Sequence, residues 1–275
     1  MQLEKKYKFS HDRQLWRLIP DESGKIIIEE RNTDTKEVFF NCLDIDSGNE
    51  IFSSFQMEEK FWIGVETIYK EIIFFHKYQK PEMPGHKGII AFDIASRETL
   101  WTNSEYSYLF VKDEKIYCYE SLFEGRKFYT LNYKTGEILE DLGNAAENVN
   151  SLMEEENSAE KYEDYVFPEV FDSAQNISDE AKKIINSFRE ERVIAGKIDF
   201  AVYSSLLIFN AHEVMPDGKL CNIFRACDIE DKTLLVDQIL NKSSETFIPD
   251  SFFIKNDLLF VLIEKVSLVV YKIKS

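Results

Sequence analysis

The chain has 275 residues, of which 44% are hydrophobic and 14% aromatic, a composition that excludes a disordered chain and favours β-strands. Its formal net charge of -17, without any run of Lys and Arg, argues against nucleic acid and anionic membranes as partners. No apolar run approaches the about 18 residues that span a bilayer, and the first residues carry no signal-peptide pattern. We therefore expect a cytoplasmic protein whose four cysteines, which lack ligand spacing, are buried thiols.

The first predicted strand covers residues 2–10 and has no hairpin partner nearby. Hairpins of two apolar strands joined by a polar turn then recur along the chain, at residues 15–30, 61–76, 108–120, 199–212 and 251–264. A second kind of hairpin follows the first four of these, at residues 41–52, 90–101, 129–140 and 225–236. Its first strand always ends in Asp or Asn: Asp44, Asp93, Asn132 and Asp228. Such side chains can bond the backbone two residues on, so we expect them to close turns and not to catalyse a reaction.

Each pair of hairpins makes a unit of four antiparallel strands. The turn residues Asp44, Asp93 and Asn132 are spaced by 49 and 39 residues, and a four-strand period of about 40–50 residues is typical of a propeller blade. Both faces of such a sheet are apolar, so we expect each sheet to be buried between two others around a ring. The last unit lacks its fourth strand, and we expect residues 2–10 to supply it by pairing with residues 267–274.

The predicted fold is therefore all-β: a five-bladed β-propeller, with a six-bladed ring as the alternative, closed by pairing of the two terminal strands. Residues 144–192 are expected to be an acidic insertion with one helix at about 178–192. Ser178 can cap that helix, and an apolar stripe follows at Ala181, Ile184, Ile185 and Phe188. The competing interpretation is a degenerate sixth blade, for which residues 165–171 are the best evidence.

The segments LDIDSGNEIF, AFDIASRETLW and LNYKTGEIL resemble the quinoprotein-like (PQQ-like) β-propeller repeat. The chain is also similar to an uncharacterised group of small bacterial propeller proteins. The resemblance implies the fold alone. The quinoprotein dehydrogenases are periplasmic, usually have more blades, and hold their cofactor with calcium and often an adjacent-cysteine disulfide. This chain has no export signal, no adjacent Cys pair and no room for eight blades, so we expect no cofactor.

Binding residues are expected on one face of the ring. Two loops, 76–88 and 212–221, each begin at a His and contain Met-Pro followed by Gly, and the insertion is predicted to reach the same face. The candidate binding residues are His76, Met83, His86, His212, Met215 and Asp217 from these loops, with Phe167 and Glu169 from the insertion. The alternative is that both loops are only packing corners. Four His, scattered along the chain, predict no metal site.

No catalytic motif is found: Ser/His/Asp and Cys/His nucleophile patterns, a phosphate-binding Gly loop and HExxH are all absent. We therefore predict no catalytic residues and a non-catalytic binding or scaffold propeller that recognises a protein or peptide. The alternative is a small intracellular hydrolase or lyase acting on a sugar-like substrate in the central funnel, since 50 acidic residues offer many carboxylate pairs. A weaker alternative is a ligand sensor with the insertion as a lid. The sequence leaves the oligomeric state open.

Overall fold

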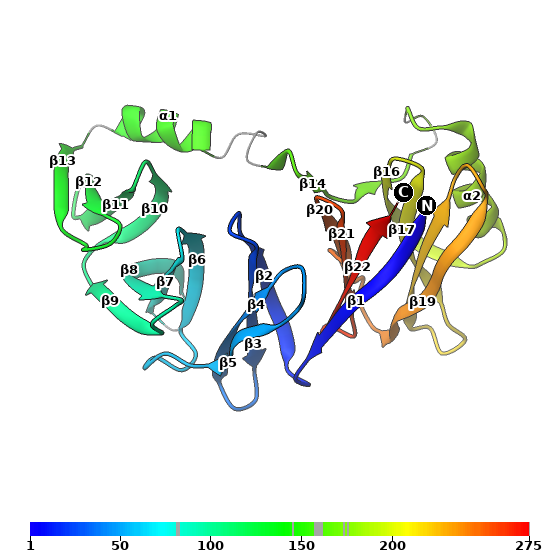
Figure 1. Ribbon diagram of the computed structural model, residues 1–275, viewed down its shortest axis with the longest axis horizontal. Helices are drawn as coiled ribbons and strands as arrows, with labels where there is room; N and C mark the ends of the chain where they lie inside the picture. The colour runs from blue at the N-terminus through cyan, green and yellow to red at the C-terminus, as the bar shows by residue number, and fades with distance from the viewer. Residues whose placement is uncertain (81–82, 145, 157–161, 173, 175, 275) are drawn as a thin grey trace. The chain divides into compact units, whose positions relative to one another are not determined.

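The computed structural model describes residues 1–275 except 81–82, 145, 157–161, 173, 175 and 275 (Figure 1). The described part is all-β, with antiparallel sheets and the helices α1 (Ala146–Glu156) and α2 (Asp179–Glu190). The chain divides into two compact units, each described by itself below. The first unit contains Met1–Arg13, Asp46–Gly48 and Glu163–Ser275, and the second contains Gln14–Ile45 and Asn49–Tyr162.

The second unit contains three sheets of four strands, each in the order of the chain. The first sheet is β2 (Gln14–Pro20), β3 (Lys25–Asn32), β4 (Glu37–Asp44) and β5 (Glu50–Phe55). The next is β6 (Ile63–Tyr69), β7 (Ile72–Lys80), β8 (Met83–Asp93) and β9 (Glu98–Asn103). The last is β10 (Ser107–Lys112), β11 (Lys115–Leu122), β12 (Gly125–Asn132) and β13 (Ile138–Gly143). The sequence prediction of repeated four-stranded antiparallel sheets is therefore confirmed in this unit.

The first unit contains two sheets of five strands. One has the order β15 (Glu169–Val170), β16 (Ile194–Tyr203), β17 (Leu206–Val214), β18 (Leu220–Asp228) and β19 (Thr233–Ser244). The other has the order β1 (Gln2–Ser10), β22 (Ser267–Lys274), β21 (Leu258–Ile263), β20 (Phe252–Lys255) and β14 (Tyr165–Val166). The segment around residues 165–171 thus adds a two-residue strand to the edge of each sheet, since β14 pairs with β20 and β15 with β16.

Alternation of apolar side chains explains why the sheets stack. On β7, Ile73 and Phe75 join a buried cluster with the sheet β2–β5, whereas Ile72 and Phe74 join another with the sheet β10–β13. Successive side chains of a strand point to opposite faces, so β7 is apolar on both. The sheet β6–β9 therefore lies between its two neighbours in the second unit. In the first unit, a third cluster joins the sheet β15–β19 to β20 and β21 through residues such as Phe224 and Leu259.

The two ends of the chain meet in one sheet of the first unit (Figure 1). β1 pairs with β22 in antiparallel register from Gln2 opposite Lys274 to Ser10 opposite Ser267, with one irregularity between Lys5 and Tyr7. The predicted pairing of residues 2–10 with residues 267–274 is confirmed. β1 supplies the strand that the C-terminal segment lacks.

The predicted turns and thiols are also found. Oδ1 of Asp93, Asn132 and Asp228 accepts hydrogen bonds from backbone N–H groups two or three residues further on. These side chains therefore close their turns, as expected. All four cysteines are free and buried, and burial raises the pKa of Cys42 and Cys118 to about 12.

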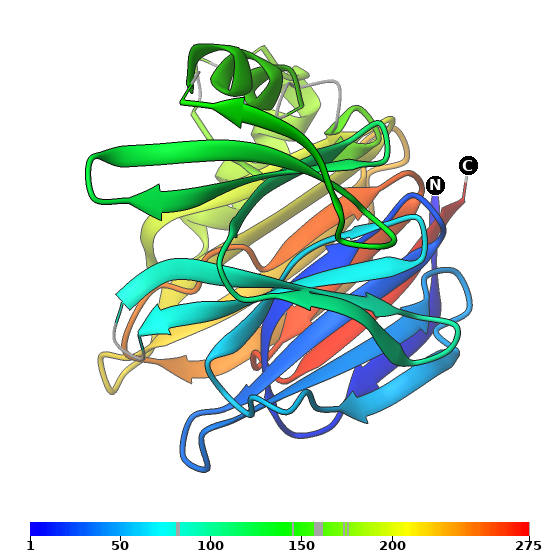
Figure 2. The ribbon, with the colours of Figure 1, turned by 90° about the vertical axis from the view of Figure 1, so that its left-hand side faces the viewer.

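The helices cover sheet faces that we expected other sheets to cover. α2 packs Phe188 and its apolar neighbours on the face of the sheet β15–β19 that carries Phe209 and Ile223. α1 packs around Val149 on the face of the sheet β10–β13 that carries Phe110 (Figure 2). The expectation that another sheet buries every sheet face is wrong for these two faces. The apolar stripe of each helix provides the cover instead.

Candidate functional site

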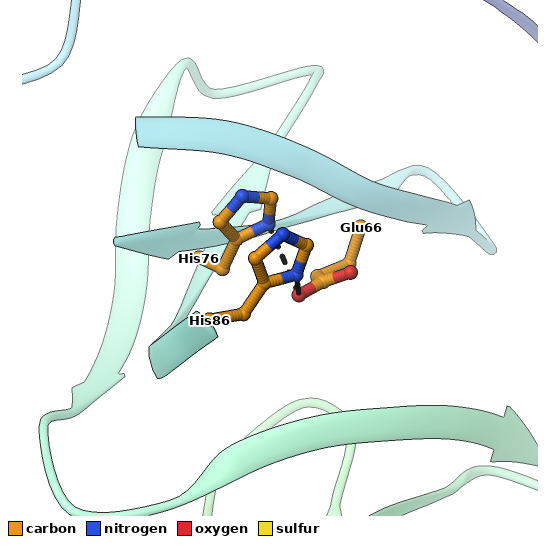
Figure 3. Close-up of side chains that lie close together, drawn as sticks. All are labelled: Glu66, His76 and His86. Carbon is orange, nitrogen blue, oxygen red and sulfur yellow. Dashed lines mark hydrogen bonds and ion pairs between the residues drawn. The ribbon is translucent and has the colours of Figure 1, made fainter. Parts of the chain in front are cut away.

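Three chemically active side chains of the second unit come together on adjacent strands. Glu66 lies on β6, His76 on β7 and His86 on β8, and we call these three residues the histidine cluster (Figure 3). Glu66 stands at an irregularity of the β6–β7 pairing, between the paired residues Val65 and Thr67. Such a bulge redirects a side chain, here toward the two imidazoles.

The histidine cluster is compact. Nδ1 of His86 lies 2.8 Å from Oε1 of Glu66, and Nδ1 of His76 lies 3.0 Å from the same oxygen. The two imidazole rings stack face to face, with centroids 3.4 Å apart and an angle of 7° between their planes. One possible ligand atom from each residue lies within 4.8 Å of the others. Two imidazoles and one carboxylate could together hold a metal ion.

Burial and the neighbouring histidines shift the pKa of Glu66 in opposite directions. Burial raises the pKa of Glu66, but the contacts with His76 and His86 outweigh it, so that the pKa lies below its ordinary value. The carboxylate is therefore negatively charged at neutral pH. Burial also raises the pKa of Tyr108, on β10 of the sheet packed against this one, and the negative charge of Glu66 adds to this effect.

The surroundings hold the two rings in place. Tyr78 meets both imidazoles edge to face, at centroid distances of 5.2 Å from His76 and 5.6 Å from His86. The Ser107 hydroxyl donates a hydrogen bond of 2.8 Å to the backbone carbonyl of His86. Gly64 lies opposite His76, and a Cβ atom there would lie 3.0 Å from the ring. Glycine at this position leaves room for the imidazole.

A second candidate surface lies in the first unit, at the end of the sheet β15–β19. Val193, Val214, Met215 and Phe247 are exposed here, and we call them the apolar end. Val214 donates a backbone hydrogen bond of 2.8 Å to Val193, and the Phe247 ring lies over Gly196. Val193 and Phe247 are 69% and 54% exposed, so two large apolar groups face solvent on neighbouring loops.

The remaining predicted residues have varied surroundings. His212, on β17, is buried beneath the edge of the Phe247 ring, and its Nε2 accepts a hydrogen bond from the backbone N–H of Ile248. Asp217 accepts a hydrogen bond from the backbone N–H two residues on and closes a turn. Phe167 is exposed and stacks with Tyr165, and Glu169 is exposed on β15.

The burial of His212 predicts a pH dependence of stability. Burial lowers the pKa of His212 below its ordinary value of 6.5, so the unfolded chain binds this proton more readily. Stability should therefore fall as the pH drops through 6.5, by up to about 1.4 kcal/mol per pH unit. Urea denaturation at pH 7.5 and 5.5 should show a larger loss for the wild type than for His212→Gln. Equal losses in the two proteins would contradict this assignment.

Of the predicted binding residues, the structure brings His76 and His86 into contact, and Met215 into the apolar end beside His212. Met83 lies on β8, but its side chain is outside the described residues. The expectation of long loops at 76–88 and 212–221 is wrong, because β7 extends to Lys80, β8 begins at Met83, and β17 and β18 extend over the ends of 212–221. The two segments belong to different units, so the predicted site between them stays a prediction. The sequence reasoning missed Glu66. Its signal was one charged residue within the otherwise uncharged segment Ile63–Tyr69.

A cavity of about 260 Å³ lies in the second unit, and it bears on the hydrolase alternative. Its lining includes Phe55, Met57, Glu58 and Glu59. Burial raises the pKa of Glu59, but hydrogen bonds from the backbone N–H groups of neighbouring residues outweigh it and lower the pKa. Glu59 is thus a charged carboxylate that accepts hydrogen bonds from the backbone of Phe61 and Trp62. A glycoside hydrolase instead uses a protonated carboxyl as its acid. The hydrolase alternative gains no support from this cavity.

Comparison with known proteins places part of the chain near an uncharacterised family. Residues 19–101, fewer than half of the chain, match the model of a Domain of unknown function (DUF4905). No curated protein matches the chain. The resemblance to the PQQ-like repeat stays a prediction.

Two solved structures are similar to the chain at low scores. The structure of the Dos1 propeller is 7% identical to this chain, with a TM-score of 0.31. The match covers 94% of this chain and 67% of the Dos1 chain. The uncharacterized protein lmo1340 from Listeria monocytogenes EGD-e is 13% identical to this chain, with a TM-score of 0.32. The match covers 91% of this chain and 75% of the lmo1340 chain. Within the described residues, neither helix has the length and apolar character to span a bilayer.

Proposed function

We propose that the protein is a β-propeller scaffold whose sheets serve as blades and which binds a protein or peptide without catalysing a reaction. Three features support the propeller. Four of the sheets contain four antiparallel strands that follow one another in the chain. In the sheet that contains β20, β21 and β22, the fourth strand is β1. Buried apolar clusters join consecutive sheets face to face within each unit. The terminal strands pair, which is a common way to close a propeller.

The apolar end carries the proposal of a partner. Val193, Val214, Met215 and Phe247 expose apolar surface at the end of β17 and on connecting segments that the sheet supports. Loops on a rigid scaffold are common binding elements, and exposed apolar groups gathered together mark interaction sites more often than isolated ones do. The salt bridge between Arg192 and Glu213, 2.9 Å long, lies directly beside these residues in the sequence and provides a polar rim.

Affinity capture with the purified chain tests this proposal. The wild type should retain one partner in stoichiometric amount from a lysate of the source cells. Phe247→Ser should weaken binding of that purified partner at least tenfold in calorimetry, because an aromatic anchor is often a hot spot of an interface.

Phe123→Ser is the matched control. Phe123 is fully exposed in the turn between β11 and β12 of the second unit, away from the four residues of the apolar end in the chain. Its replacement should leave binding unchanged, and both variants should keep the melting temperature of the wild type. No captured partner, or equal binding by Phe247→Ser and the wild type, would contradict the proposal.

A further inference from the structure

The histidine cluster brings together three side chains of the kind that bind metal ions. Its three side chains come from three hydrogen-bonded neighbouring strands, β6, β7 and β8, so the sheet itself sets their spacing (Figure 3). His76 lies opposite Gly64, and His86 lies opposite Tyr78, two residues further along the strand of His76. Residues opposite each other, or two apart on one strand, share a face. The two imidazoles therefore share a face of the sheet, and the bulge at Glu66 brings its carboxylate to them.

His76 is buried without hydrogen bonds to its ring from the described residues, which indicates that it binds a further group. Its side chain is only 2% exposed, yet neither ring nitrogen has a hydrogen-bond partner among the described residues. Nδ1 lies 3.0 Å from Oε1 of Glu66, but His86 makes the hydrogen bond to that same oxygen at 2.8 Å. An unsatisfied buried polar group is costly, and native proteins avoid it unless the group has a further role. Coordination of an ion would give the buried imidazole a partner.

We propose that Glu66, His76 and His86 bind one divalent transition-metal ion, with Zn²⁺ as the best match. Imidazole nitrogen with carboxylate oxygen suits zinc and its neighbours, whereas Mg²⁺ and Ca²⁺ prefer oxygen ligands alone. Two His and one Glu form a known type of three-ligand zinc set that leaves a fourth position open.

The donor atoms lie somewhat closer together than a bound ion would hold them. Zinc bonds of about 2.0–2.1 Å to nitrogen and oxygen place tetrahedral ligands about 3.3 Å apart. The two nitrogens of the cluster lie 2.8 and 3.0 Å from the Glu66 oxygen, so these contacts would widen by a few tenths of an ångström around the ion. A metal ion binds an imidazole nitrogen in the plane of the ring, so one of the two stacked rings would also turn out of the stack. The His86 side chain is 39% exposed, which gives the ion a route of entry and gives its fourth ligand a place.

Two neighbouring residues limit the movement of the histidines. Ser107 holds the backbone of His86, and Tyr78 packs edge-on against both imidazoles. The metal site and the apolar end lie in different units, so this inference does not rest on the proposed partner.

Calorimetric titration of the full chain with ZnCl₂ tests the proposal. The chain is first stripped with a chelator, and excess MgCl₂ is present to occupy the acidic surface. The wild type should bind one Zn²⁺, and its melting temperature should rise with added Zn²⁺ because the ion binds the folded state. Bound Co²⁺ should give a visible absorption band that Zn²⁺ removes.

Single substitutions identify the ligands. Glu66→Gln and His86→Gln should each weaken Zn²⁺ binding at least tenfold and abolish the rise in melting temperature. His86 is partly exposed, so His86→Gln should fold even if changes at the buried His76 do not. His11→Gln and His212→Gln, which change the two other histidines of the chain, should bind Zn²⁺ like the wild type. Absence of binding to the folded wild type, or equal affinity in His86→Gln and the wild type, would overturn the proposal.

Discussion

Replacing Arg31 with alanine is expected to lower the free energy of unfolding by about 3–5 kcal/mol. Arg31 lies on β3, is 5% exposed, and donates to Glu29 at 2.7 Å. Its other nitrogens donate to the backbone carbonyls of Phe61 and Ile63 at 2.8 and 2.7 Å. The substitution would leave the Glu29 carboxylate buried without its cation, and one of its oxygens already lacks a hydrogen bond. Urea denaturation measures the loss.

Two comparisons separate the buried charge from a general loss of packing. Lys115→Ala removes an exposed ion pair with Glu140 and should cost less than about 1 kcal/mol. The double variant Glu29→Met with Arg31→Met removes both charges and should recover most of the stability that Arg31→Ala loses. A loss below 1 kcal/mol for Arg31→Ala would show that this pair is not buried as described.

Replacing Phe188 with alanine should cost a similar amount, about 3–5 kcal/mol, because it empties the contact between α2 and the sheet β15–β19. The Phe188 ring is buried, meets Phe209 at a centroid distance of 5.2 Å, and lies beneath the guanidinium of Arg225 at 4.7 Å. Chemical denaturation measures the change in free energy.

The neighbouring residue on α2 gives the control. Arg189 is exposed, and Arg189→Ala should change the stability by no more than about 0.5 kcal/mol. If both variants have the stability of the wild type, α2 does not cover the sheet, and the expectation of a neighbouring sheet on that face returns.

Local chemistry made most of the fold predictable. Asp93, Asn132 and Asp228 mark turns because their side chains bond nearby backbone groups, a preference that acts within a few residues. The pairing of the two ends was also predictable, since the last sheet lacked a strand and the first segment lacked a partner. Both inferences depend on hydrogen-bond satisfaction, which a sequence pattern reveals.

The cover of the outer faces was not predictable in the same way. The apolar stripe around Phe188 predicts a helix with one buried side. Whether that side packs on connecting loops or on the sheet β15–β19 depends on tertiary packing, which the stripe does not reveal. α1 had no such stripe in the sequence reasoning, and yet Val149 is buried against β10–β13.

The histidine cluster was half predicted. His76 and His86 were singled out by the Met-Pro segment 76–88 in which both lie, but Glu66 lies on a different strand and turns toward them because of a bulge. Register shifts of this kind follow from the pairing of whole strands, so ten or twenty residues of sequence do not reveal them. For the same reason the scattered histidines predicted no metal site.

The propeller proposal depends most directly on the pairing of β1 with β22, and a disulfide tests that register. Glu4 lies opposite Lys272, so cysteines at these two positions share a face and should cross-link on mild oxidation, as intact-mass spectrometry would detect. Lys5→Cys with Lys272→Cys places the thiols on opposite faces and should stay reduced. Failure of Glu4→Cys with Lys272→Cys to cross-link in the folded chain, or equal cross-linking of both pairs, would contradict the pairing.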